Sequence, residues 1–87
     1  MDKIVTLNTI RHYYQHEYRD TERSVARERE QGASFDTINN TVRCALSRCL
    51  GVSFFVQECG IEFKDIEKLY MEFYEKFRKL LDTPAEM

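Results

Sequence analysis

The fold is decided by the stretch from Phe35 to Gly60, which reads FDTINNTVRCALSRCLGVSFFVQECG. Its apolar residues recur at alternating steps of four and three, the spacing that aligns side chains along one side of an α-helix. This spacing predicts a helix over residues 35–59 with a heptad seam that packs in a core or against a second copy. The seam residues are Ile38, Val42, Ala45, Cys49, Val52, Val56 and Cys59.

A second apolar row, Leu46, Leu50 and Phe54, lies on another side of this predicted helix. Few charged residues interrupt the segment, so we expect the helix to be central and covered on more than one side. Gly51 costs about 1 kcal/mol relative to alanine inside a helix. We therefore expect another backbone to approach closely at Gly51.

The N-terminal third predicts a long helix over residues 3–31. Its inward stripe ends at Tyr18, and beyond that point only Val25 and Ala26 are available for burial. We expect this charged half to lose contact with the core. Gly32 and Ser34 then predict a turn, because glycine suits a left-handed helix end and serine caps the next helix. The stripe consists of Ile4, Leu7, Ile10, Tyr14 and Tyr18.

The C-terminal third predicts a helix over residues 63–82, followed by a short tail at 83–87. Gly60 ends the preceding helix, and Ile61 and Ile66 have the spacing of a hydrophobic staple. So short a turn makes the last two helices antiparallel neighbours. The residues expected to be buried are Phe63, Ile66, Tyr70, Phe73, Phe77 and Leu80.

Together these segments predict one all-α domain over residues 1–87, a three-helix arrangement completed by homodimerisation. A single core is already marginal for 87 residues, so a second domain is excluded. The half-charged first helix covers the central helix incompletely, and a second copy of the chain would supply the missing cover.

Composition narrows the functional classes. A formal charge of −2 gives no overall attraction to nucleic acid or anionic lipid. The sequence carries no signal-peptide core or membrane-length apolar run, so we expect a cytoplasmic protein.

Three cysteines at spacings of five and ten predict reduced, buried thiols rather than a zinc site. No catalytic motif is present, and we expect neither enzymatic activity nor a cofactor.

Two polar patterns lie on the first predicted helix. Arg19, Arg23 and Arg27 recur every four residues and could bind a phosphate or a partner's carboxylates. Acidic neighbours favour a solvated, ion-paired face as the simpler interpretation. His12 and His16 are one turn apart, which permits a metal site, although histidines on a helix flank are more often solvated.

Three further residues lie beside the predicted buried stripes, namely Tyr13, Met71 and Tyr74. Exposed tyrosine and methionine are typical of protein interfaces, because they bury a large area or adapt their shape. We therefore expect Tyr13, Met71 and Tyr74 to bind a protein partner, together with Arg19 and the other two arginines of its row.

Residues 55–69 resemble a helix-turn-helix, since apolar residues flank a turn glycine, Gly60. Val56 replaces the small residue expected under the turn. The would-be recognition surface mixes acidic residues with Lys64 and Lys68, which is unfavourable beside phosphates. DNA binding by a degenerate helix-turn-helix is therefore an alternative, possible but not favoured.

The leading hypothesis is a non-enzymatic helical module that binds a protein partner and forms a homodimer. Small size and a helical surface also permit a compact antagonist from a mobile element that docks on a host protein complex. The fold class alone does not decide between these functions.

Overall fold

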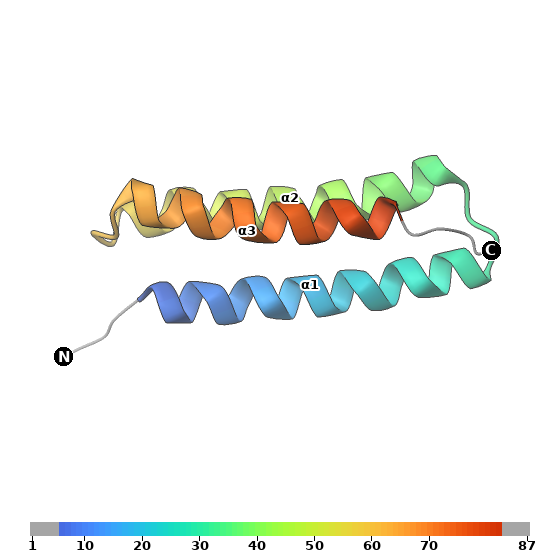
Figure 1. The fold of residues 1–87 in the computed structure, drawn as a ribbon, viewed down its shortest axis with the longest axis horizontal. Coiled ribbons are helices and arrows are strands. Elements are labelled where there is room, and N and C mark those ends of the chain that lie inside the picture. Colours follow the sequence, from blue (N-terminus) through green and yellow to red (C-terminus); the bar gives the residue numbers. More distant parts are fainter. Residues whose placement is uncertain (1–5, 83–87) are drawn as a thin grey trace.

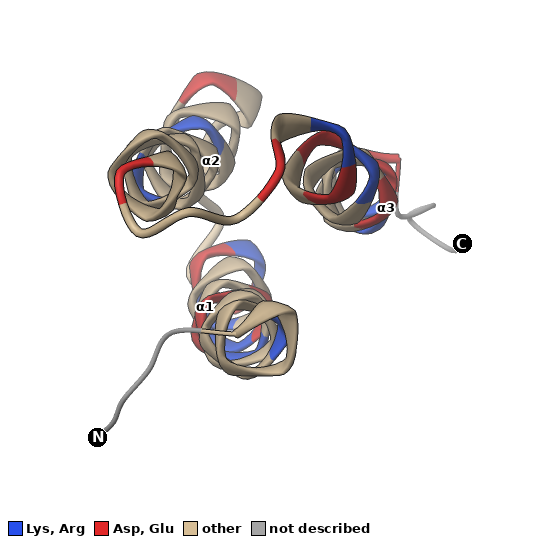
Figure 2. Ribbon diagram, turned by 90° about the vertical axis from the view of Figure 1, so that its left-hand side faces the viewer, with Lys and Arg blue, Asp and Glu red and all other residues tan. Residues whose placement is uncertain are grey.

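A computed structural model describes residues 6–82 and confirms the all-α, three-helix architecture. The helices are α1 (Leu7–Glu30), α2 (Phe35–Gln57) and α3 (Phe63–Leu81). They run side by side along one long axis, with α1 below the pair formed by α2 and α3 (Figure 1). Viewed along that axis, the three helices occupy the corners of a triangle (Figure 2). Ile4 and residues 83–87 lie outside the described residues.

Local capping determines where the helices begin and end. The hydroxyl of Ser34 accepts a hydrogen bond of 3.2 Å from the backbone N–H of Thr37, which confirms the predicted start of α2. Gly32 and Gly60 adopt φ angles of 77° and 91° in the two turns. A side chain would be strained in this left-handed conformation, so glycine is required at both turns.

The core lies on the axis of the triangle and receives side chains from all three helices. Most of the predicted seam of α2 is buried there, together with Ile10 and Tyr14 of α1. The largest fully buried side chains are Tyr14, Phe73 and Phe77, so aromatic rings fill the space between the helices. Tyr14 packs edge-on against Phe73, with ring centroids 5.5 Å apart.

The prediction that α1 leaves the core after Tyr18 is wrong. Thr21 and Val25 are both buried, so α1 covers the core almost to its C-terminal end. Thr21 tolerates burial because its hydroxyl donates a 2.8 Å hydrogen bond to the backbone carbonyl of Glu17 in the same helix. Because this bond satisfies its hydroxyl, Thr21 can be buried as an apolar residue would be.

Two predictions about packing are also wrong. Phe63 is 56% exposed rather than buried, whereas Leu69, which the stripe omitted, belongs to the core. Phe63 is the first residue of α3, and it lies beside Leu50, Phe54 and Met71, which are themselves exposed. Gly51 is exposed, and no atom lies within 4 Å of the place that a β-carbon would occupy, so no backbone approaches it.

The buried rings predict a sharp contrast between two phenylalanine substitutions. Phe77 is fully buried and packs edge-on against Tyr18 at 5.4 Å, whereas Phe55 is 64% exposed. Phe77→Ala is expected to lower the free energy of unfolding by about 3–5 kcal/mol, because it leaves a cavity. Phe55→Ala should change it by less than about 0.5 kcal/mol. Urea denaturation followed by circular dichroism measures both, and equal losses would contradict this packing.

Candidate interaction surface

A groove runs along the outer surface of the bundle, between α2 and α3. It consists of two adjoining hollows with volumes of about 410 Å³ and 220 Å³, which share Leu50 and Tyr70. The residues that line both hollows come from α2 and α3 and none comes from α1, so the groove lies on the side of these helices away from α1. We call it the α2–α3 groove.

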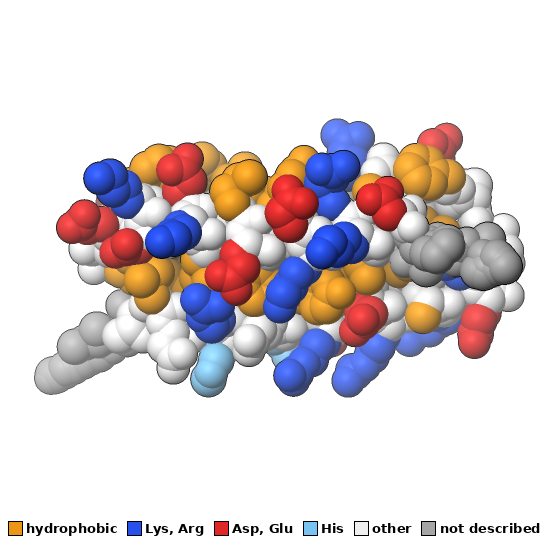
Figure 3. Space-filling view, in the orientation of Figure 1, with side chains coloured by type: hydrophobic (Ala, Val, Ile, Leu, Met, Phe, Trp, Pro, Cys, Tyr) orange, Lys and Arg blue, Asp and Glu red, His pale blue; other side chains and the backbone are white. Residues whose placement is uncertain are grey.

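Large apolar side chains line this groove and remain accessible to solvent. Phe54 is 61% exposed, Met71 47% and Leu50 42%, and Phe63 stands beside them at the end of the groove. Hydrophobic side chains appear along the upper edge of the molecule, over α2 and α3 (Figure 3). Leu50 and Phe54 of the second apolar row therefore point outward and are not covered within the single chain, whereas Leu46 packs against the core.

The charges of the α2–α3 groove are separated along its length. Arg43 of α2 and Arg78 of α3 line the larger hollow, and Glu67 of α3 lines the smaller one. One half of the groove is therefore positive and the other negative, with apolar residues between. Met71 and Tyr74, two of the predicted partner-binding residues, lie in this groove.

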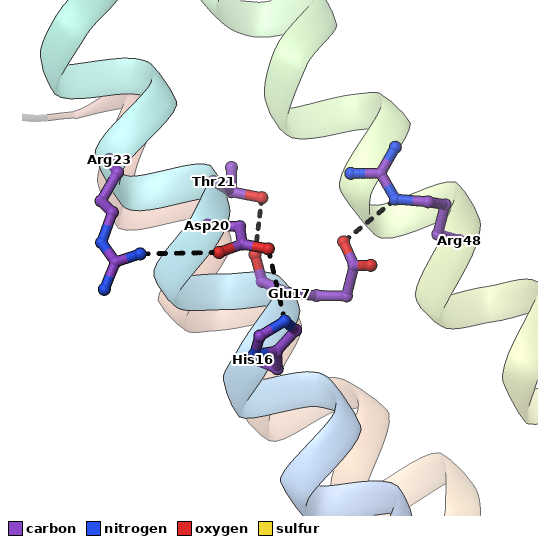
Figure 4. A network of polar contacts seen from close by, with 6 residues as sticks. All are labelled: His16, Glu17, Asp20, Thr21, Arg23 and Arg48. Carbon is purple, nitrogen blue, oxygen red and sulfur yellow. Dashed lines mark hydrogen bonds and ion pairs between the residues drawn. The ribbon is translucent and has the colours of Figure 1, made fainter.

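The predicted arginine row occupies a different surface, the outer face of α1. Arg19, Arg23 and Arg27 are exposed, and α1, which carries them, forms the lower edge of the molecule in the orientation of Figures 1 and 3. The Nη1 atom of Arg23 lies 3.9 Å from a carboxylate oxygen of Asp20 (Figure 4). Such an exposed pair contributes at most about 1 kcal/mol and partly neutralises the row.

His12 and His16 share this outer face. The Nε2 atom of His16 lies 3.6 Å from the other carboxylate oxygen of Asp20 (Figure 4). Among the described residues, no three His, Cys, Asp or Glu side chains converge as metal ligands. The arrangement that the structure shows for His16 is an exposed contact with Asp20.

Tyr13 lies at the contact between α1 and α2, apart from Met71 and Tyr74. It is partly buried, and its pKa is raised by burial and by the neighbouring carboxylate of Glu17. That carboxylate accepts a 3.0 Å hydrogen bond from Nε of Arg48, which links α1 to α2 (Figure 4). The predicted set of aromatic and methionine contacts is thus divided between two sides of the bundle.

The heptad seam of α2 forms the core of a single chain. Val52 is partly buried against that core, and Cys59 is exposed. Because α1 and α3 cover this seam, the exposed apolar side chains of α2 lie elsewhere, Leu50 and Phe54 in the α2–α3 groove and Phe35 and Phe55 outside it. The buried seam residues are Ile38, Val42, Ala45, Cys49 and Val56.

The three cysteines are free thiols in different environments. Cys49 is buried, and its pKa is raised to about 12 by burial and by the charge of Glu17. Cys44 and Cys59 are exposed, so the prediction of buried thiols is wrong for both. Cys59 lies two residues beyond the end of α2, in the turn, and is therefore not part of the buried seam. His16 lies on the outer face of α1, remote from the buried thiol.

The geometry of α2 and α3 differs from that of a helix-turn-helix. The two helices lie side by side along their length (Figure 1). In a helix-turn-helix, the second helix crosses the first at roughly 90–120° and so projects toward the DNA. The apolar spacing of residues 55–69 reflects a helical hairpin that packs on itself.

Comparisons with protein families, with curated proteins and with solved structures found no match to this chain. Along the described part of the chain, no helix combines the length and apolar composition that a membrane span requires. A function for this chain must therefore be inferred from its own surfaces.

The thiol environments predict selective chemical modification. At pH 8 a thiol of pKa about 12 is ionised in only about one molecule in ten thousand, and burial also blocks reagent access. A Cys44→Ser, Cys59→Ser double variant, which retains Cys49, should react slowly with a disulfide reagent when folded and rapidly in denaturant. Wild-type protein should show two fast thiols. Fast reaction of the folded double variant would contradict the burial of Cys49.

Proposed function

We propose that this chain is a non-enzymatic helical module of the cytoplasm that acts by binding a protein partner. The observation that carries the proposal is the α2–α3 groove, in which Leu50, Phe54 and Met71 are exposed side by side. Contiguous apolar surface is unfavourable in water, and in monomeric proteins it often marks an interaction site. A partner that covers this groove removes that surface from water.

The composition of the groove supports this assignment over the outer face of α1. Protein interfaces are enriched in aromatic residues, methionine and arginine, and the groove combines Tyr70, Met71, Tyr74 and Arg78. The arginine row of α1 is separated from this apolar surface, and one of its members, Arg23, pairs with Asp20. We therefore propose the groove as the main binding surface.

The chemistry of the buried thiol supports a non-enzymatic role. A cysteine nucleophile requires an accessible thiolate, usually beside a histidine or another cation. Cys49 is buried with a raised pKa, whereas His12 and His16 are exposed on the outer face of α1. Cys49 is therefore not placed to act as a nucleophile.

Site-specific photo-crosslinking in cells tests this proposal. A photoreactive phenylalanine analogue at Tyr74, which lines the groove, is expected to give a discrete adduct with another polypeptide chain. Leu50→Glu should abolish that adduct, because it places a charge in the apolar centre of the groove. Phe55→Glu, an equivalent change on α2 outside the groove, should leave the adduct intact.

A second position of the photoreactive analogue distinguishes specific adducts from random collisions. The same analogue at Arg19, on the outer face of α1, serves as the reference for random collisions. If Tyr74 gave no adduct beyond those formed from Arg19, the groove would not be a binding surface in cells. Any single adduct specific to Tyr74, including one with a second copy of this chain, supports the proposal.

A further inference from the structure

The charges of the α2–α3 groove are arranged symmetrically about its centre. On α3 the groove extends from Phe63 to Leu81, so its midpoint is residue 72. Glu67 precedes that midpoint by five positions and Arg78 follows it by six. At about 1.5 Å per residue, each charge lies roughly 8 Å from the centre, on opposite sides.

The lining of α2 has a matching arrangement. It extends from Asn39 to Gln57, with its midpoint at residue 48. Arg43 precedes this midpoint by five positions and Phe54 follows it by six. Each helix therefore presents a cationic side chain in one half of the groove and a group that attracts cations in the other half.

We infer that the occupant of the α2–α3 groove is a second copy of this chain, in an antiparallel, twofold-symmetric dimer. The twofold axis runs perpendicular to the helices, between the two facing grooves and at the level of their centres. With this axis α3 faces α3 of the partner subunit and α2 faces α2, and the facing helices run in opposite directions. Arg78 then lies opposite Glu67 of the partner subunit, and the symmetry forms this ion pair twice. This inference rests on the proposed role of the groove as a protein-binding surface.

The same rotation places the second cationic side chain opposite an aromatic ring. Arg43 comes to the level of Phe54 of the partner subunit, again twice per dimer. A guanidinium over the face of a phenylalanine ring is a favourable cation–π contact. The register that matches the charges is also the one that overlaps the two grooves along their whole length, which buries the most apolar surface.

A parallel twofold arrangement is disfavoured by the same charges. With the axis along the helices, α2 would face α3 of the partner subunit at the same end of the groove. Arg43 would then oppose Arg78 of the partner subunit twice, and like charges across an interface are strongly unfavourable. The charge pattern therefore selects the antiparallel dimer.

A charge-exchange experiment tests this inference. Arg78→Glu and Glu67→Arg are each expected to weaken association about tenfold, because each places like charges opposite each other twice. The double variant Glu67→Arg, Arg78→Glu should restore association to within about threefold of wild type, since the pairs re-form with exchanged signs. Glu67 and Arg78 are both exposed, and circular dichroism should show unchanged helix content.

Sedimentation equilibrium from about 1 μM to about 1 mM measures the dimer dissociation constant over the range of weak to moderate interfaces. Salt of about 0.05 M limits screening of the exposed pairs. Arg19→Glu, the same charge change on the outer face of α1, is the matched control and should leave dissociation unchanged. Leu50→Glu should give a monomer.

Each outcome separates this inference from the proposed function. A monomeric wild-type protein at 1 mM overturns the dimer, whereas a crosslink from Tyr74 to a different protein would leave the groove as a binding surface. A wild-type dimer whose dissociation constant is unaffected by Arg78→Glu or Glu67→Arg would place the dimer contact elsewhere and also overturns the inference. Weakening by both single variants and recovery in the double variant supports it.

Discussion

The bundle depends on the complete burial of Tyr14 where the three helices meet. Its ring packs edge-on against Phe73 and Tyr70 of α3, while its hydroxyl hydrogen-bonds the Ser53 hydroxyl and donates to the Cys49 carbonyl of α2. A buried hydroxyl needs such partners, and burial raises the pKa of Tyr14. One side chain therefore aligns α1 with both neighbours, because a slip of one helical turn, about 5.4 Å, would leave the hydroxyl unpaired.

The exposed groove follows from the width of the apolar surface of α2. In a three-helix bundle each helix touches two neighbours, and those contacts cover the seam that contains Val42 and Cys49. The apolar surface of α2 is wider than this and continues to Leu50 and Phe54, on the side opposite α1. Burial of the seam and exposure of the second row are two results of the same sequence pattern.

Much of the fold could be predicted from short-range signals. The alternating steps through Ile38 and Val42 identify the buried side of α2, and the capping by Ser34 and the glycines of the turns act within a few residues. Predictions failed where burial depends on a neighbouring helix. Thr21 is buried because α2 and α3 extend beside it, whereas Phe63 is exposed because it lines the outward-facing α2–α3 groove.

The candidate site was predictable only in part, for the same reason. Met71 and Tyr74 lie beside the inward stripe of α3, which indicates partial exposure from sequence. Leu50 and Phe54 form a second apolar row that sequence shows to need cover, but spacing cannot show which part of that row the other two helices leave exposed. The opposite charges of Glu67 and Arg78 become meaningful only when the lining of the groove is known.

Besides Tyr14, three arginines join α1 to its neighbours by hydrogen bonds. Arg48 bonds to Glu17, Arg11 to Glu72 and Arg29 to the backbone carbonyl of Leu80. None of these six residues lines the α2–α3 groove. The lining of the groove can therefore change by mutation while the polar contacts that align α1 stay in place, so the binding surface can diverge independently of its scaffold.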